Sequence, residues 1–280
     1  MIGKVNMKKL NSKETKQVLL QILVFFDEFC KKNNLRYTLA YGTLLGAARH
    51  EGFIPWDDDI DVEMPLSDYR KCLSILEKQP ISSRYQLHSM NTELKYNEKY
   101  YYPFAKLEDS QTQIHIFKTH DIGGAFIDIF PMTPLPRNEK LWYFYNKKAR
   151  LLKIMISGID GTNRSKFRNS VSYLEGKIFN YRSIRNSLWN LATKYETHNS
   201  SSYLVDGTWH DYKDKNFFPK EWFDSYNTLL FEGYNLSVIE NYKEMLKHDY
   251  GNWKKLPPRS QRVPHHDYDL FLKRRKDENS

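Results

Sequence analysis

The sequence predicts an α+β protein in which a single domain spans residues 1–280. Between about residues 10 and 135, short alternating apolar runs that suit strands are interspersed with amphipathic helical runs, which predicts a mixed sheet with helices. From about residue 136 to 270 the apolar residues mostly recur at the helical period, which predicts a helical C-terminal half. The sequence has no internal repeats and no Gly/Ser-rich linker, so we expect both parts to form one continuous domain.

The first expected element is a helix from Asn11 to Lys32. Asn11 and Glu14 have the spacing of a capping box, and the basic pair Lys31-Lys32 complements the helix dipole at the other end. A strand, a small-residue turn that opens a short helix, a second strand and a second helix should follow. Their expected positions are Arg36–Tyr41 for the first strand, Gly42-Thr43 for the turn, a start near Asp59 for the second strand, and Ser67 to about Lys78 for the second helix.

Further strands complete the first part of the chain. Their expected bounds are Tyr85–His88, Tyr102–Leu107, Thr112–Phe117 and Ala125–Phe130. The second part opens with a basic, aromatic helical stretch from Leu141 to about Lys194. This stretch fits a helix with one packed and one solvated face, and the alternative is a surface that meets anionic lipid or a lipid-linked glycan. We expect irregular structure from Asn216 to Tyr234 and a helix from Ile239 to Tyr250 that Gly251 caps.

The composition limits the class of protein. The 280 residues include 43 Lys and Arg against 34 Asp and Glu, a net charge of +9 that attracts anions such as nucleic acid, acidic lipid or a nucleotide diphosphate. Cys30 and Cys72 are the only cysteines, which does not support a structural zinc site, and we expect both to be reduced core residues. The sequence shows no signal-peptide pattern and no membrane-spanning apolar run. We therefore expect a cytoplasmic protein, peripheral at the inner face of the membrane at most.

Acidic residues gather between Asp57 and Asp61. If a strand starts near Asp59, then Asp59 and Asp61 share one face of it, about 6.7 Å apart. Oxygen ligands without soft partners suit Mg²⁺ or Mn²⁺, so we predict a metal site that includes Asp57, Asp59 and Asp61. Two other interpretations are a solvated acidic turn and a calcium-binding loop. The second lacks glycine at its sixth position, where Val62 stands.

Asp128 lies in the run Ala125–Phe130, which is apolar on both faces. A lone ionised carboxylate there would be costly to bury unless it were paired or bound to a metal. We therefore predict that Asp128 is the third catalytic carboxylate, beside Asp59 and Asp61, on a strand adjacent to theirs. The alternative is a buried Asp that is hydrogen-bonded to a loop.

Several further residues are candidates for binding an anionic donor. A strand, a small turn opening a helix and an Asp-x-Asp strand resemble the site of nucleotidyltransferase-fold enzymes. In such a site the backbone N–H groups of Gly42 and Thr43 would cradle phosphate, although most Gly-Thr pairs are ordinary turns. The basic candidates near these blocks are Arg49, Lys106, Arg262 and the pair His265-His266, with Lys106 and Arg262 favoured.

The longest motif resembles the signature block of one family. GTLLGAARHEGFIPWDDDIDVEM, at residues 42–64, is similar to that block in the LicD family of phosphotransferases, whose relatives include the fukutin-type proteins. Shorter pieces agree with the resemblance: Phe126–Pro131, Phe231–Gly233, Tyr250–Trp253 and Leu256–Pro258. The resemblance therefore covers about residues 10–270.

This resemblance implies transfer of phosphocholine from CDP-choline to a hydroxyl of a cell-surface glycan, such as teichoic acid or lipopolysaccharide, or of a lipid-linked precursor. Mg²⁺ or Mn²⁺ would be the cofactor, and no nucleic-acid partner is expected. Three alternatives stay open: transfer of ribitol or glycerol phosphate from a CDP donor, nucleotidyl transfer to a small molecule, and a non-catalytic anion-binding module.

Overall fold

A mixed seven-stranded sheet forms the centre of the protein in the computed structural model. The model describes residues 7–78, 82–89, 104–116, 123–135, 140, 143–144, 147–152, 181–196, 203–206, 217–264 and 268–273. The main path of the sheet runs β2 (Thr38–Leu39), β3 (Asp61–Pro65), β7 (Phe126–Pro134), β5 (Ala105–Asp109) and β4 (Tyr85–His88), while β8 (Tyr203–Asp206) pairs with β7, and β9 (Phe218–Pro219) pairs with β8. The β3–β7 pair is parallel and the other pairs are antiparallel, so the predicted mixed sheet is confirmed.

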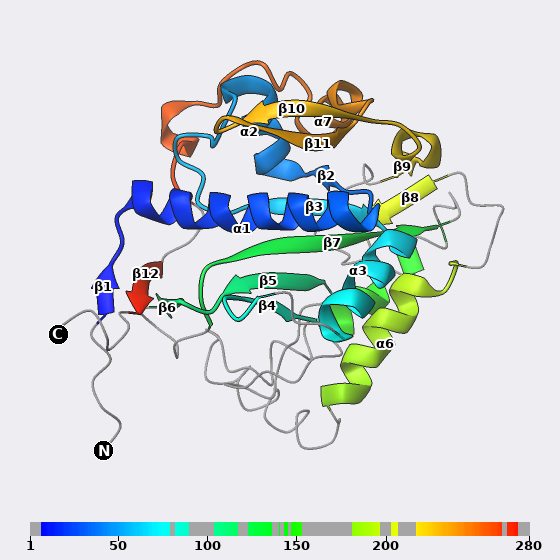
Figure 1. Ribbon diagram of the computed structural model, residues 1–280. Coiled ribbons are helices and arrows are strands. Elements are labelled where there is room, and N and C mark those ends of the chain that lie inside the picture. The colour runs from blue at the N-terminus through cyan, green and yellow to red at the C-terminus, as the bar shows by residue number, and fades with distance from the viewer. Residues whose placement is uncertain are drawn as a thin grey trace, which may run out of the picture.

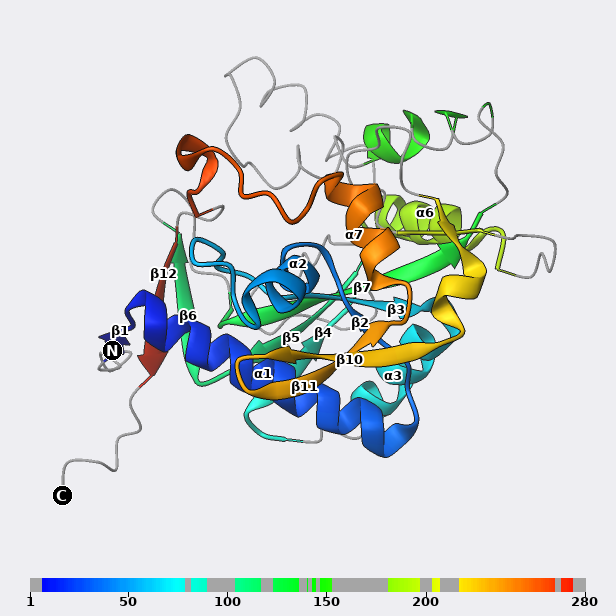
Figure 2. The same ribbon diagram turned by 90° about the horizontal axis from the view of Figure 1, so that it is seen from above.

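Helices lie on both sides of this sheet (Figures 1 and 2). The long helix α1 (Ser12–Asn33) and α3 (Leu66–Lys78) pack against β7 on one side. The short helix α2 (Tyr41–His50) lies on the opposite side, where it contacts α7 (Tyr242–Tyr250). Helix α6 (Tyr181–Thr193) packs on α3 through Tyr69 and Trp189. None of the described helices is both long and apolar enough to cross a membrane.

Two small sheets complete the described fold. Strand β12 (Tyr268–Lys273) pairs with both β1 (Met7–Lys9) and β6 (Thr112–Ile116), which brings the two ends of the described chain together (Figure 1). The hairpin of β10 (Tyr226–Phe231) and β11 (Tyr234–Ile239) packs beside α2 and β2. The short 3-10 helices η1 (Lys220–Phe223) and η2 (Arg259–Gln261) lie in the connecting segments.

The structure confirms the capping box that was predicted for the N-terminal helix. The Asn11 side chain accepts a hydrogen bond from the Glu14 N–H, and the Glu14 carboxylate accepts one from the Asn11 N–H, both at 2.9 Å. The apolar face of α1 joins the main core, in which Ile22, Leu23 and Phe26 are fully buried. Cys30 and Cys72 are free and buried, as expected.

Residues 153–180 of the predicted helical stretch lie outside the described residues, and the prediction of a helical C-terminal half is not confirmed. Its described residues contain strands β8 to β12 as well as α6 and α7. The segment Asn216–Tyr234, predicted to be irregular, contains β9 and β10. The β10–β11 hairpin turns at Glu232 and Gly233, whose φ angles of 49° and 88° fit a type I′ turn. A Glu-Gly pair is not among the preferred sequences of that turn, which is why the hairpin gave no clear signal.

Three predicted bounds also shift. The strand expected over Arg36–Tyr41 is limited to Thr38–Leu39, because Tyr41 already begins α2. The strand expected near Asp59 starts at Asp61. The last helix starts at Tyr242 rather than at Ile239, because Ile239 pairs with Tyr226 in the hairpin.

Candidate active site

Parallel pairing of β3 with β7 places two of the predicted carboxylates side by side. Asp61, the first residue of β3, is the register partner of Asp128 in β7. The prediction that Asp128 stands on a strand adjacent to the acidic run is therefore confirmed. On the other side of β7, Lys106 of β5 is also in register with Asp128. Three ionisable side chains thus meet across three neighbouring strands.

The acidic run lies in the loop that leads into β3. Asp57, Asp58 and Asp59 can each offer one carboxylate oxygen such that the three lie within 4.8 Å of one another. Because Asp59 precedes the strand, the argument that strand alternation puts it on one face with Asp61 is wrong. A loop can instead turn consecutive side chains toward one point. Asp58, which the sequence reasoning did not nominate, joins the cluster for that reason.

The electrostatics show that these carboxylates act on one another. Burial raises the pKa of Asp61 well above its usual range, and the charges of Asp59, Asp128 and Asp57 raise it further, while Lys106 opposes the rise. Burial and the neighbouring Asp59 raise the pKa of Asp57 to about 7. Carboxylates crowded in this way repel one another when ionised, and a divalent cation would remove that repulsion. The oxygen-only donor set fits Mg²⁺ or Mn²⁺.

Gly42 and Thr43 are not a turn before the helix, as predicted, but the second and third residues of α2. A Cβ atom on Gly42 would lie 2.5 Å from Asp57 Oδ2, so glycine allows the helix to approach this carboxylate. The buried Thr43 hydroxyl accepts a hydrogen bond from the Asp61 N–H at 2.9 Å. Ala40 gives α2 no side-chain cap, so the first N–H groups of α2 point out of the helix without a cap from that residue.

Lys106 lies inside the site. Its Nζ donates to Asp128 Oδ1 at 2.6 Å and stands 3.4 Å from the centre of the Phe126 ring. Both side chains of the pair are largely buried. A cation held between a carboxylate and an aromatic ring is placed to meet a phosphate that approaches the carboxylates.

The other basic candidates gather beside Trp56, the residue before the acidic run. The Arg262 guanidinium lies over the Trp56 ring at 5.5 Å, and the His50 ring meets the same ring edge-on at 6.5 Å. Arg49 donates to the Trp253 carbonyl at 2.9 Å, and the positive charge of Arg262 acts on the Arg49 guanidinium. His265 and His266 lie outside the described residues.

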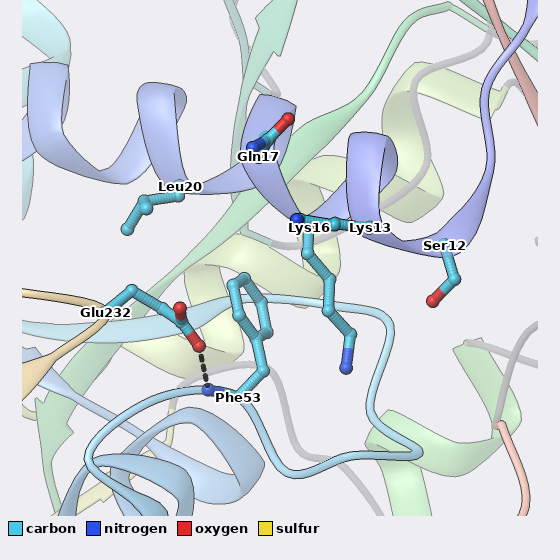
Figure 3. A pocket seen from close by; sticks show the side chains of 7 residues that line it. All are labelled: Ser12, Lys13, Lys16, Gln17, Leu20, Phe53 and Glu232. Atoms are coloured by element: carbon cyan, nitrogen blue, oxygen red, sulfur yellow. Dashed lines mark hydrogen bonds between the residues drawn. The ribbon is translucent and has the colours of Figure 1, made fainter.

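Two residues that sequence reasoning did not nominate hold the loop before the acidic run. Lys16 of α1 donates to the carbonyls of Ile54 and Pro55, both at 3.1 Å. The Glu232 carboxylate accepts a hydrogen bond from the Phe53 N–H at 3.1 Å. Figure 3 shows these side chains around a pocket of about 420 Å³. Glu232 lies in one of the family-like blocks, which was the available signal, whereas Lys16 gave none.

Carboxylates grouped at the start of a parallel strand pair, with a lysine and a helix N-terminus beside them, define a site suited to anionic, phosphate-bearing substrates. A family model described as "LicD/FKTN/FKRP, nucleotidyltransferase domain" matches residues 34–156, which include the acidic run, Lys106 and Asp128. The chain is 31% identical to the lipopolysaccharide cholinephosphotransferase LicD of Haemophilus influenzae over 278 residues, which cover 95% of this chain and 100% of that protein. The chain therefore belongs to the LicD family of transferases.

Shorter matches concern part of the chain. An uncharacterized protein of Rickettsia prowazekii is 50% identical over 50 residues, 18% of this chain and 19% of that protein. The human ribitol 5-phosphate transferase FKRP is 53% identical over 38 residues, 14% of this chain and 8% of that protein. Both stretches are too short to carry an activity across by themselves.

Proposed function

We propose that this chain transfers phosphocholine from CDP-choline to a hydroxyl group of a cell-surface glycan, such as lipopolysaccharide, or of its lipid-linked precursor. The likeness to the cholinephosphotransferase, over 95% of this chain and the whole of that protein, supports this choice of group and acceptor. The observation that carries the chemistry is the pairing of Asp61 with Asp128 beside Asp57 and Asp59.

Each side chain of the site receives a role in this reaction. Asp57, Asp59, Asp61 and Asp128 would hold one or two Mg²⁺ or Mn²⁺ ions, which would neutralise the donor diphosphate and lower the pKa of the acceptor hydroxyl. Lys106 and the N–H groups of Gly42 and Thr43 bind donor phosphate oxygens. Arg49, Arg262 and Trp56 form a cationic and aromatic wall for the nucleotide.

The reaction exchanges the phosphoanhydride bond of the donor for a phosphoester bond to the acceptor. The acceptor oxygen forms a bond to the phosphorus of phosphocholine, the bond from that phosphorus to CMP breaks, and the acceptor proton passes to a base. CMP leaves with the electron pair. Because the donor is a cytosolic nucleotide, we place the reaction on the cytoplasmic side, with the acceptor presented at the membrane.

A screen of activated donors tests this function. The purified chain with Mg²⁺ or Mn²⁺ and a lipopolysaccharide acceptor should release CMP from CDP-choline faster than from CDP-ribitol or CDP-glycerol. Asp59→Asn and Asp61→Asn should each reduce this rate by more than about a hundredfold, since each removes charge that supports the transition state. Asp224→Asn, an exposed carboxylate outside the site, serves as the matched control.

Two results would change the proposal. Pyrophosphate release from a nucleoside triphosphate, without CMP release from any CDP donor, would indicate nucleotidyl transfer. A preference for CDP-ribitol would select transfer of ribitol phosphate, the group named for the ribitol 5-phosphate transferase to which a short stretch of this chain is similar.

A further inference from the structure

Glu63 stands two residues beyond Asp61 in β3 and is fully buried. Because alternate residues of a strand share a face, its side chain lies on the same side of the sheet as that of Asp61. Neither of its carboxylate oxygens has a hydrogen-bond partner among the described residues. The Tyr41 hydroxyl, which donates to Asp206 Oδ2 at 2.8 Å, also lies near the Glu63 carboxylate. A fully buried carboxylate with no hydrogen bond of good geometry points to a cation as its partner, because such a group is costly to keep unpaired.

Two more carboxylates face Glu63. The charges of Asp206 and Asp249 both act on it. Asp206 is 2% exposed, whereas the side chain of Asp249 is 17% exposed and therefore reaches solvent. In the described part of the chain, the acids that gather their oxygens within 4.8 Å are Asp57, Asp58 and Asp59, and Glu63 is not among them. Glu63 therefore lies outside the compact acidic cluster that suits a bare metal ion, and an organic cation is the alternative partner.

Aromatic rings border the same group. Phe130 is the register partner of Glu63, and its ring meets the Tyr41 ring edge-on at 5.6 Å and the Phe104 ring at 4.6 Å. Tyr41 has a φ of 44°, an uncommon value for a bulky residue. Such a conformation persists where the surrounding structure holds a residue in place, and here the Tyr41 side chain is held by its hydrogen bond to Asp206 and its contact with Phe130. Aromatic faces together with carboxylates are the surroundings that bind quaternary ammonium groups.

The Glu63 group is continuous with the metal-binding carboxylates. The charges of Asp249, Asp61, Asp57 and Asp59 all act on Tyr250, so both groups of carboxylates lie near this residue. Side chains two residues apart on a strand are separated by about 6.7 Å. An ester oxygen and a two-carbon chain separate the phosphorus of phosphocholine from its nitrogen. A phosphoryl group held at Asp61 therefore brings this nitrogen within reach of Glu63.

We propose that Glu63, Asp206 and Asp249, with the rings of Tyr41, Phe130 and Phe104, form the subsite for the quaternary ammonium group of the donor. This inference rests on the proposed function and assigns its selectivity to named residues. The ammonium group compensates the buried negative charge, and a neutral alditol cannot do so.

Paired donors of different charge test the subsite. Binding of CDP-choline and of the neutral CDP-glycerol is measured by calorimetry on the purified full chain with Mg²⁺. The wild type should prefer CDP-choline, and tetramethylammonium should compete with it. Glu63→Gln keeps the shape of the side chain but removes its charge, so the preference should fall by about tenfold or more while CDP-glycerol binding changes little. Asp27→Asn, a buried carboxylate of α1 bonded to Tyr37 and Lys31, is the control and should keep the preference.

The outcomes separate the subsite from the function. A Glu63→Gln variant that retains the wild-type preference overturns the subsite and leaves the proposed function standing. A wild type that binds neither donor overturns both. If Glu63→Gln fails to fold, the variants Asp249→Asn and Tyr41→Leu are used instead, and the ratio of CDP-choline affinity to CDP-glycerol affinity is measured for each. A ratio equal to that of the wild type in both variants overturns the subsite.

Discussion

Thr43 illustrates how a single hydroxyl can position the site. Its oxygen accepts the N–H of Asp61, the residue at which β3 begins and the acidic loop ends. The side chain is buried, and α2 and β3 are thereby joined at the residue that pairs with Asp128. The sequence indicated a small polar residue near phosphate, but the partner of its hydroxyl depends on the contact between helix and strand.

Substitutions of Thr43 test whether its hydroxyl positions Asp61 or whether its side chain only fills space. Thr43→Val keeps the volume and leaves the part-buried Asp61 N–H without its acceptor, which should cost about 1–3 kcal/mol of stability. The variant should also need more Mg²⁺ for half-maximal activity, because Asp61 is no longer fixed. Thr43→Ser should restore both properties. Titrations of activity with Mg²⁺ and denaturant unfolding measure the two effects, and a normal Mg²⁺ requirement in Thr43→Val would remove the positioning role.

Residue-scale prediction succeeded where the signal was local. Asp128 stood out as an acid in an apolar run, and its place beside Asp61 followed from two strand assignments. Glu63 gave no comparable signal, because its neighbours Asp206 and Asp249 come from distant segments. The role of Asp58 was hidden by the assumption that a strand begins near Asp59.

At the scale of elements, the loop between α2 and β3 depends on its supports. Lys16 of α1 and Glu232 of the β10–β11 turn bond consecutive residues of this loop, Phe53 to Pro55 (Figure 3). The Glu232 N–H also donates to the Glu51 carbonyl at 2.9 Å. Burial lowers the pKa of Lys16, and the charges of Asp57 and Glu232 oppose this change, so its ammonium group stands near the acidic run.

A helix substitution tests this support. Lys16→Met keeps much of the side-chain stem but loses the donors to Ile54 and Pro55, so the acidic loop should become less well fixed. We expect about a tenfold loss of turnover, since each hydrogen bond from a charged donor is worth about 1.5–3 kcal/mol. Lys13→Met, at an exposed position of the same pocket, is the matched control in the CMP-release assay. Equal rates of CMP release for Lys16→Met and Lys13→Met would contradict the role of Lys16 in holding the acidic loop.

Elements with strong local signals were predicted well. The capping box set the start of α1, and Gly251, with a φ of 64°, ends α7 through its N–H to the Lys247 carbonyl. The hairpin Tyr226–Ile239 was missed because its turn sequence is unusual and its packing against α2 involves distant residues. Periodicity therefore gave the element types of the first half more faithfully than those of the second.

At the scale of the whole molecule, the site joins segments from nearly the full chain. Strands β3, β5 and β7 bring Asp61, Asp128 and Lys106 together, and the region from α7 to Arg262 adds cations and aromatic rings. The sequence indicated the first group through a compact motif. The second required the tertiary fold, because residue spacing alone does not show which distant segments pack on α2.

The pH dependence of folding stability should reveal the repulsion between the carboxylates of this site. The pKa of Asp57 is about 7 in the folded protein, above its unfolded value of about 3.9, so the folded state binds more protons between these pH values. Without metal, the contribution of Asp57 is full at low pH and is lost as pH rises through 7, an effect on the order of a few kcal/mol. Mg²⁺ or Mn²⁺ binds ionised carboxylates and should therefore raise the melting temperature more at pH 8 than at pH 5.

Asp57→Asn should flatten the pH dependence in EDTA and reduce the metal-induced rise, whereas the Asp224→Asn control should follow the wild type. Thermal melts at both pH values, with EDTA and with each metal, provide the measurement. If Asp57→Asn matched the wild type in both respects, Asp57 would not belong to the metal site.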